Sequence, residues 1–119
     1  MRTKYGNHKV KRDGMVFDSK READRWTELK LLEKAGEITN LQRQVKFELI
    51  PTQYSKWEYT KSGKKKVLER EASYIADFVY HDNKFDVDVV EDAKGMRTDA
   101  YILKRKLMLH VHGIQIMEV

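Results

Sequence analysis

The sequence predicts one α/β domain, in which a mixed sheet is flanked by two helices. Two segments with helical spacing of apolar residues bracket a longer region of alternating and β-branched residues. Clusters of Gly, Asn and Asp separate the predicted strands. The chain of 119 residues is long enough for one core and too short for two domains. The order of helix, three or more strands, helix and strand is typical of helices packed on a mixed sheet.

The first helix is predicted over residues 19–35. Ser19 is a favourable N-cap residue, and the glycine directly after residue 35 can end the helix in the left-handed conformation. Glu22, Trp26 and Leu29 follow the i, i+4, i+7 spacing, which places Glu22 on the apolar stripe. Glu22 also forms a capping box with Ser19, so helix capping and a site at the sheet end explain this residue equally well.

The strands are predicted from alternation and turn residues. They are residues 41–50 before Pro51, a hairpin over 54–69 turning at Ser62–Gly63, residues 72–80 and 85–95 around a turn at 81–84, and residues 113–119. A second helix is predicted over residues 98–110 with Thr98 as its cap. Ala100, Leu103 and Leu107 recur at helical spacing and are expected to face the core.

The formal net charge of +5 is concentrated at the N-terminus. Five basic residues precede the first acid, so residues 1–12 carry +5 and the remainder balances to zero. This predicts a basic arm, residues 1–12, joined to a single domain, residues 13–119. Such an arm suits a polyanionic partner, and Lys9, Lys11 and Arg12 are candidate DNA-binding residues. A solvated tail that maintains solubility explains the same charge equally well.

Several classes of protein are excluded or disfavoured. The chain has no cysteine, which excludes disulfides, thiolate zinc sites and cysteine nucleophiles. It has no apolar run long enough for a bilayer and no signal-peptide core at its N-terminus, so a cytoplasmic protein without a membrane partner is expected. His110 and His112 lack zinc-site spacing, and the glycines form no phosphate-binding loop. No small-molecule cofactor is therefore expected.

Acids and a lysine meet at the ends of two predicted strands. Asp77 lies within the apolar strand 72–80, where a buried carboxylate requires a partner. In the next strand, alternation places Asp92 and Lys94 on one side and Glu91 on the other, and a one-residue slip of register would exchange Glu91 for Asp92. Carboxylates suit Mg²⁺ in phosphate chemistry, with Lys94 holding water or neutralising charge on phosphate. An exposed Asp92–Lys94 ion pair is the simpler explanation.

Basic residues flank this acidic region on both sides. The candidate DNA-binding residues are Lys64, Lys65 and Lys66 before it, and Arg97, Lys104 and Arg105 after it. Tyr101, Lys104, Arg105 and Met108 share one face of the predicted second helix, which can offer cations to phosphates. A solvated basic face is the alternative for each of these residues.

The segments "FDSKREADRW", "LQRQVKFELI", "YIADFVY" and "VVEDAKG" resemble, in order and spacing, a family of small phage and prophage proteins. That family is placed in the PD-(D/E)xK, or restriction-endonuclease-like, nuclease superfamily, and the resemblance covers residues 4 to 109. It implies an αβββαβ core, dependence on Mg²⁺ or Mn²⁺, and a DNA substrate. The motif positions correspond to Glu22, Asp77, Asp92 and Lys94. Ala76 stands where the superfamily name has proline.

The resemblance implies a metal-dependent DNA endonuclease. Asp77, Asp92 and the Ala93 carbonyl would bind the metal, Glu22 would assist, and Lys94 would position water, while Gln44 is a weaker candidate for the same site. Branched DNA in phage replication or recombination is the expected substrate, and the small chain favours a homodimer. The alternative is a non-catalytic DNA-binding module with a nuclease-like fold. An RNA-directed nuclease is disfavoured, because no aromatic platform for base stacking is evident in the sequence.

Overall fold

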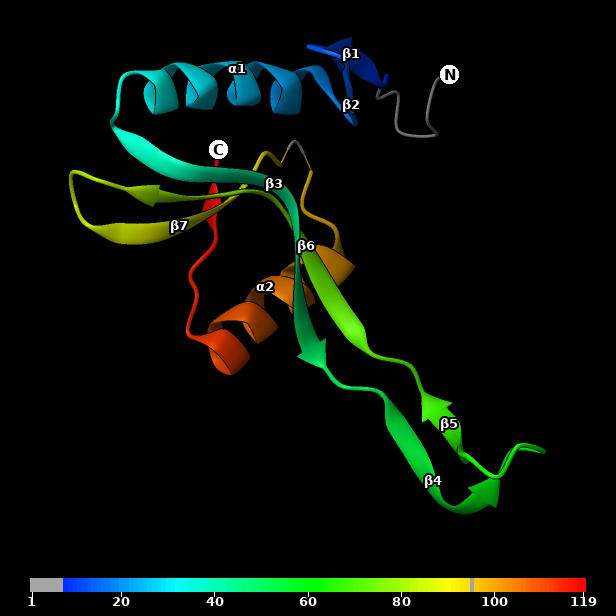
Figure 1. Cartoon of the computed structure of the whole chain (residues 1–119). Helices are drawn as coiled ribbons and strands as arrows, with labels where there is room; N and C mark the ends of the chain where they lie inside the picture. Colours follow the sequence, from blue (N-terminus) through cyan, green and yellow to red (C-terminus); the bar gives the residue numbers. More distant parts are fainter. Residues whose placement is uncertain (1–7, 95) are drawn as a thin grey trace.

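The computed structural model describes residues 8–94 and 96–119 (Figure 1). The helices are α1 (Lys20–Lys34) and α2 (Asp99–His112). The strands are β1 (Val10–Arg12), β2 (Met15–Phe17), β3 (Ile38–Ile50), β4 (Gln53–Tyr59), β5 (Lys65–Glu69), β6 (Ala72–Asp82), β7 (Val87–Asp92) and β8 (Met117–Glu118). Neither helix in this part of the chain has the length and apolar run required to cross a bilayer.

The central sheet has four strands in the order β3-β6-β7-β8. The β3–β6 and β6–β7 pairs are antiparallel and the β7–β8 pair is parallel. Helices α1 and α2 lie on opposite sides of this sheet (Figure 1). The predicted α/β class, with a mixed sheet flanked by helices, is confirmed. When the hairpins β1–β2 and β4–β5 are set aside, the elements follow the order α1-β3-β6-β7-α2-β8.

Each helix packs on the sheet through its own hydrophobic cluster. The cluster under α1 contains Phe17, Ala23, Trp26, Leu29, Ile38, Phe78, Tyr80 and Val89. The cluster under α2 contains Leu49, Tyr74, Ala76, Val90, Tyr101, Met108 and Ile116. Burial of these apolar side chains on both faces is the main force that holds the three layers together.

Both predicted helices are present with the predicted caps. The Ser19 hydroxyl accepts a hydrogen bond from the Glu22 amide at the start of α1, and the Thr98 hydroxyl accepts one from the Tyr101 amide at the start of α2. Gly36, with φ +79°, follows α1 in the left-handed conformation that glycine tolerates without steric cost.

The expected core face of α2 is wrong in part, because Leu107 packs against the cluster under α2 but Ala100 and Leu103 do not. Tyr101 and Met108 are the buried residues, whereas Leu103 is 58% exposed, Ala100 is exposed and Leu107 is only half-buried. Apolar residues occur on several sides of this helix, so their spacing does not select one face. Packing against the sheet selects the face with Tyr101, because its hydroxyl finds a partner in Glu118.

Several strand boundaries differ from prediction. Strand β7 covers Val87–Asp92 and not residues 85–95, and β8 covers Met117–Glu118 and not residues 113–119. Strand β3 begins at Ile38 rather than at residue 41, through an irregularity in its pairing with β6 between Thr39 and Gln42. The turn predicted at residues 81–84 lies two residues later, at 83–86, because Asp82 ends β6 and accepts hydrogen bonds from the amides of Lys84 (2.8 Å) and Phe85 (3.1 Å).

The hairpin β1–β2 crosses the boundary expected between arm and domain. Phe17 of this hairpin is fully buried, and Val10 and Met15 pack against the cluster under α1. Arg12 donates a 2.8 Å hydrogen bond to Asp24 of α1. Residues 10–12 of the expected arm are therefore part of the folded body, and residues 1–7 lie outside the described part of the chain.

Candidate functional site

An open pocket of about 620 Å³ lies where the first turn of α1 meets the middle of β6 and the segment that follows β7. The described residues that line it are Asp18, Ser19, Lys20, Arg21, Glu22, Asp77, Ala93, Lys94, Met96 and Thr98. Three segments far apart in sequence thus meet here, and they bring together Glu22, Asp77 and Lys94, which the sequence singled out.

Asp77 lies where β6 and β7 diverge. Backbone pairing between these strands ends at Phe78 and Glu91. Beyond that point the Asp77 side chain takes the place of backbone pairing, because its Oδ2 atom accepts a 2.8 Å hydrogen bond from the Ala93 amide. This bond positions the start of the segment that carries Lys94 against the middle of β6.

Asp92 is buried, with 2% of its surface exposed. Its Oδ2 atom accepts a 2.6 Å hydrogen bond from the Tyr74 hydroxyl. Its Oδ1 atom lies 3.2 Å from the Lys94 ammonium, but the angles there do not make a hydrogen bond, and no other described group provides one. The Lys94 ammonium thus offsets the charge of this buried oxygen without a hydrogen bond to it, so a better aligned donor or a metal cation would stabilise the carboxylate further.

Lys94 stands between Asp92 and an aromatic ring. Its ammonium lies 4.4 Å from the centroid of the Tyr101 ring, a cation–π distance. The side chain is 29% exposed and lines the pocket, whereas Asp92 lies behind it. A cation that binds both Asp77 and Asp92 therefore requires the Lys94 ammonium to move off Asp92.

Glu91 faces the other side of the sheet, towards α1. Its Oε1 atom accepts from Arg25 Nε at 2.8 Å, and its Oε2 atom accepts from Arg25 Nη2 at 2.6 Å and from the Tyr80 hydroxyl. The residue is fully buried. Both oxygens are thus satisfied by a two-point pair with arginine, which gives Glu91 a structural position and favours Asp92 as the pocket-side carboxylate.

Glu22 makes contacts both at the start of α1 and in the pocket. Its amide donates to Ser19 Oγ, while its carboxylate Oε1 lies 3.2 Å from Gln44 Nε2 and 3.6 Å from Arg43 Nη2 on β3. Gln44, the weaker candidate from the sequence, therefore reaches this group. Its φ of +57° is left-handed, a conformation that costs a non-glycine residue roughly 1–2 kcal/mol. Strain of this kind is often found at functional sites.

The carboxylates of this site repel one another. Burial, followed by the negative charges of Asp92 and Glu22, together raise the pKa of Asp77 to about 7. Burial and then the charge of Asp18 raise the pKa of Glu22, with Arg43 opposing them. The electrostatic field therefore favours either a proton or a cation among these three acids.

The donor set suits Mg²⁺ or Mn²⁺. Asp77 and Asp92 supply hard oxygen atoms, including the Oδ1 atom of Asp92 that lacks a hydrogen bond, and Ala93, the residue after Asp92, supplies a backbone carbonyl. Mg²⁺ is commonly held by one or two carboxylates, with water and phosphate completing its coordination. No three His, Cys, Asp or Glu side chains within residues 8–94 and 96–119 are grouped closely enough to share one ion.

Many of the candidate DNA-binding residues are paired with acids. Lys9 pairs with Asp18, Arg12 with Asp24, Lys66 with Glu58, and both Arg97 and Arg105 with Glu118. Lys11, Lys64, Lys65 and Lys104 are exposed. The predicted basic face of α2 is wrong in part, because Tyr101 and Met108 on that face are buried against the sheet. Lysines 64–66 stand on the β4–β5 hairpin and not at the pocket.

Three residues around the site were not predicted from the sequence. Tyr74 holds Asp92, Arg25 holds Glu91, and Glu118 holds the Tyr101 hydroxyl at 2.7 Å. Arg97, Tyr101 and Arg105 together lower the pKa of Glu118 to about 2, with Arg97 contributing most. Each contact joins different elements, so no local spacing in the sequence indicates it.

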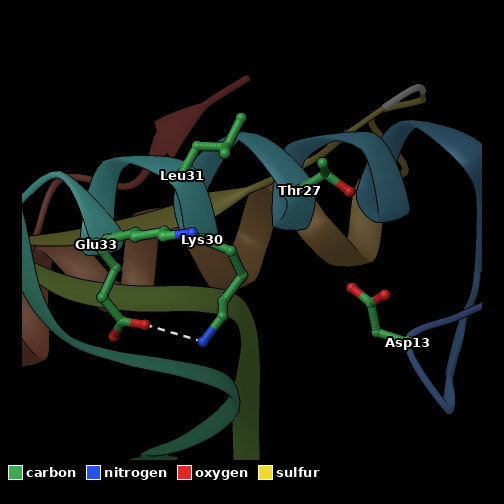
Figure 2. Close-up of a pocket in the computed structure, with 6 residues that line it drawn as sticks. Asp13, Thr27, Lys30, Leu31 and Glu33 are labelled. Carbon is green, nitrogen blue, oxygen red and sulfur yellow. Dashed lines mark hydrogen bonds and ion pairs between the residues drawn. The ribbon is translucent and has the colours of Figure 1, made fainter.

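A second hollow of about 400 Å³ lies beside α1, as Figure 2 shows. Its described lining is Asp13, Thr27, Lys30, Leu31, Glu33 and Lys34. Lys30 and Glu33 pair with each other at 2.9 Å, and Leu31 is 64% exposed. This hollow lies away from the acids described above and holds no pair of buried carboxylates among its lining residues.

The sequence profile of one family matches residues 2–117, and the description of that family is Protein of unknown function (DUF1064). No curated protein and no solved structure gives a significant match to the chain. The match covers nearly the whole sequence, including every residue of the pocket. The chain therefore belongs to the family described as Protein of unknown function (DUF1064).

Proposed function

We propose that this chain is a metal-dependent DNA endonuclease of the PD-(D/E)xK, restriction-endonuclease-like type. One observation carries the proposal: the half-buried Asp77 and the buried Asp92 lie where β6 and β7 diverge, and Lys94 lies next to Asp92. The order α1-β3-β6-β7-α2-β8 agrees with the αβββαβ core that the sequence resemblance implies. The proposal therefore rests on the site and on the arrangement of the elements together.

The residues that would hold Mg²⁺ or Mn²⁺ are Asp77, Asp92 and the carbonyl of Ala93, with Glu22 in support. When bound, the cation supplies Lewis-acid polarisation of the phosphate and lowers the pKa of the attacking water. Two hydrogen bonds orient these acids in advance, from the Ala93 amide to Asp77 and from the Tyr74 hydroxyl to Asp92. Pre-oriented ligands of this kind reduce the cost of forming the site.

Lys94 has two roles in the proposed reaction. Its ammonium, free to leave Asp92, orients the attacking water by hydrogen bonding and stabilises negative charge on the phosphate oxygens. The water oxygen forms a bond to phosphorus, the bond from phosphorus to the leaving sugar oxygen breaks, and one proton of the water is transferred to that oxygen. Tyr101 positions Lys94 for this role, because its ring lies beneath the ammonium.

The proposed substrate is DNA with branches, as in phage replication and recombination, and the proposed location is the cytoplasm. A chain of 119 residues covers little DNA by itself, so the proposal includes a homodimer. The exposed basic residues Lys11, Lys64, Lys65 and Lys104 supply phosphate contacts. These contacts make binding salt-dependent, because each neutralised phosphate releases counterions.

The test compares cleavage of supercoiled, linear duplex, single-stranded and four-way-junction DNA with Mn²⁺, Mg²⁺ or EDTA. Wild type is compared with Asp77→Ala and Lys94→Ala, and Lys84→Ala, at an exposed turn, is the matched control. We expect cleavage that requires metal, is lost in both site variants and persists in the control. Binding without cleavage under every condition would support the non-catalytic DNA-binding module instead. Cleavage retained by Lys94→Ala would remove the assignment of that residue.

A further inference from the structure

We propose that the β4–β5 hairpin is an arm that binds unpaired DNA bases by stacking them on Trp57 and Tyr59. The proposal extends the nuclease function above and rests on it for the link to cleavage. It adds a substrate class: DNA in which an unpaired strand lies near the cut, as at a fork, a flap or a junction.

The hairpin projects from the body of the molecule. Strands β4 and β5 form a separate two-stranded sheet that continues outward from β3 and β6, away from both helices (Figure 1). The radius of gyration is 17.9 Å, whereas a compact chain of this length has a radius of about 13.5 Å. All five residues of β5 are exposed. Two-stranded hairpins have marginal stability alone in water, so this one is suited to a partner.

Large aromatic side chains lie open on this arm. Trp57 is 78% exposed, Tyr59 59% and Tyr54 54%, whereas Trp26 in the core is 9% exposed. Tryptophan exposed to this degree is unusual in a protein surface, and several such rings together indicate a contact surface. Flat aromatic rings are the side chains on which unpaired bases stack.

The backbone beneath Trp57 is held in place. Ser55 is buried, and its hydroxyl accepts hydrogen bonds from the amides of Trp57 (3.3 Å) and Glu58 (2.9 Å). The pairing of β4 with β5 is irregular across this stretch, between Tyr54 and Tyr59. The local turn therefore presents the indole ring from a fixed backbone, which reduces the entropy lost when a base stacks on it.

The charge of the arm identifies a polyanion as its partner. Five lysines against two glutamates give residues 53–69 a formal charge of +3. A second copy of this arm would bring lysines against lysines, and lysine on an edge strand opposes strand-to-strand association. Lysine is also depleted in the centres of protein–protein interfaces. The presence of both lysines and exposed aromatic rings on one hairpin instead suits a single nucleic-acid strand, with its phosphates and bases.

One face of the arm also has a hollow that can receive a nucleotide. It has a volume of about 630 Å³ and is lined by Tyr54, Thr60, Ser62, Lys64, Lys65 and Val67. An aromatic ring, two hydroxyls and two ammonium groups meet there. These groups suit a base, a sugar and a phosphate respectively.

The arm reaches DNA outside the proposed cut site. Asp77 and Lys65 are separated by twelve residues of nearly continuous extended chain, which spans at most about 40 Å. One turn of duplex DNA is about 34–36 Å long. The hairpin therefore contacts the substrate about one helical turn from the pocket, where an unpaired strand of a branched substrate can lie.

The test measures binding of fluorescent single-stranded, duplex and forked DNA of equal length, and of single-stranded RNA, in EDTA. Wild type is compared with Trp57→Ala and Trp57→Phe, and Phe85→Ala is the matched control, because Phe85 is 68% exposed on a different hairpin with Lys84 near its ring. We expect Trp57→Ala to weaken binding of single-stranded and forked DNA about 10-fold, with duplex binding changed less than about twofold. Trp57→Phe should retain most affinity, and Phe85→Ala all of it.

Tryptophan fluorescence supplies a second readout. Bound single-stranded DNA should quench emission in wild type, and in Trp57→Phe the quenching should be lost, because the remaining Trp26 is in the core. Circular dichroism checks that each variant folds, which is expected because Trp57 makes no core contact.

Several outcomes would overturn the proposal. One is a loss of affinity in Trp57→Ala that is equal for duplex and single-stranded DNA, and another is tighter binding of RNA than of DNA. A third is a wild-type dimer that dissociates in Trp57→Ala while DNA affinity per protomer is unchanged, which would make the arm a protein interface. Binding in EDTA requires no cleavage. The binding test of the hairpin and the cleavage test of Lys94→Ala are therefore independent, and a negative result in one does not decide the other.

Discussion

The Tyr74 hydroxyl donates a 2.6 Å hydrogen bond to Oδ2 of Asp92, inside the cluster under α2. The bond leaves Oδ1 of the same carboxylate without a hydrogen bond from any described group. Burial and then the contact with Asp92 raise the pKa of Tyr74, so the hydroxyl remains a donor at any working pH. Tyr74 thus fixes one oxygen of Asp92, and the other oxygen lies beside Lys94, which lines the pocket.

We expect Tyr74→Phe to lower Mn²⁺ affinity and cleavage by about 10–100-fold, because the carboxylate loses the group that orients it. Titration calorimetry with Mn²⁺ measures the affinity. Tyr101→Phe is the matched control, since it removes another buried tyrosine hydroxyl, one that contacts Glu118 and not Asp92. Equal effects of the two variants on Mn²⁺ affinity would argue against a positioning role for Tyr74.

Glu91 and Asp92 are adjacent in sequence, but we expect substitution of Glu91 to reduce stability and substitution of Asp92 to reduce metal binding. Glu91→Ala leaves the guanidinium of Arg25 without its buried partner, and breaking such a pair costs about 3–5 kcal/mol of folding free energy. Asp92→Asn should instead abolish Mn²⁺ binding with a much smaller change in stability. Urea unfolding together with Mn²⁺ titration of both variants separates the two roles. Loss of Mn²⁺ binding in a folded Glu91 variant, with binding retained in Asp92→Asn, would assign the ligand to Glu91.

The raised pKa of Asp77 predicts a stability that depends on pH. The folded protein holds the Asp77 proton up to a pKa of about 7, against 3.8 for the unfolded chain. The folded state therefore binds more protons between these values, and the free energy of unfolding falls as pH rises through this window. Glu22, whose pKa is also raised, contributes in the same direction.

In EDTA we expect wild type to lose about 1–3 kcal/mol of stability between pH 5.5 and pH 8 from Asp77. Asp77→Asn should lack that loss, and Asp99→Asn, an exposed acid on α2, should keep it. Added Mn²⁺ should stabilise wild type more at pH 8 than at pH 5.5, because the ion competes with the proton. The measurement is urea unfolding at both pH values. A change in the free energy of unfolding with pH that is the same in Asp77→Asn as in wild type would contradict the prediction.

The left-handed conformation of Gln44 predicts that glycine is more stabilising than alanine at this position, the reverse of the usual order in a strand. Both Gln44→Gly and Gln44→Ala remove the amide that contacts Glu22, but only glycine relieves a φ of +57°. We expect the glycine variant to be more stable than the alanine variant by about 1 kcal/mol. At Val45, the next residue of β3, the same pair should show the ordinary order, with alanine more stable. Thermal unfolding of the four variants decides this.

The sequence was sufficient for the elements that depend on local chemistry. Ser19 and Thr98 start the helices as predicted, because a hydroxyl that accepts from an amide three residues later acts within one turn. Alternation along β7 also placed Glu91 and Asp92 on opposite sides of the sheet, because the period of a strand is a property of its backbone. Lys94 lies beyond the end of β7, so its contact with Asp92 does not follow from that period. The α/β class followed from these periods and from chain length.

Contacts between distant segments were decided by the tertiary structure alone. Sequence spacing does not show that Tyr74 holds Asp92, that Arg25 neutralises Glu91, or which face of α2 is buried, because several faces of that helix are apolar. The same holds for the exposed rings of Trp57 and Tyr59: in sequence they resemble ordinary strand residues, and no stacking platform was expected. Only the extension of β4–β5 beyond the core leaves those rings uncovered, because side-chain burial depends on which other elements pack against a strand.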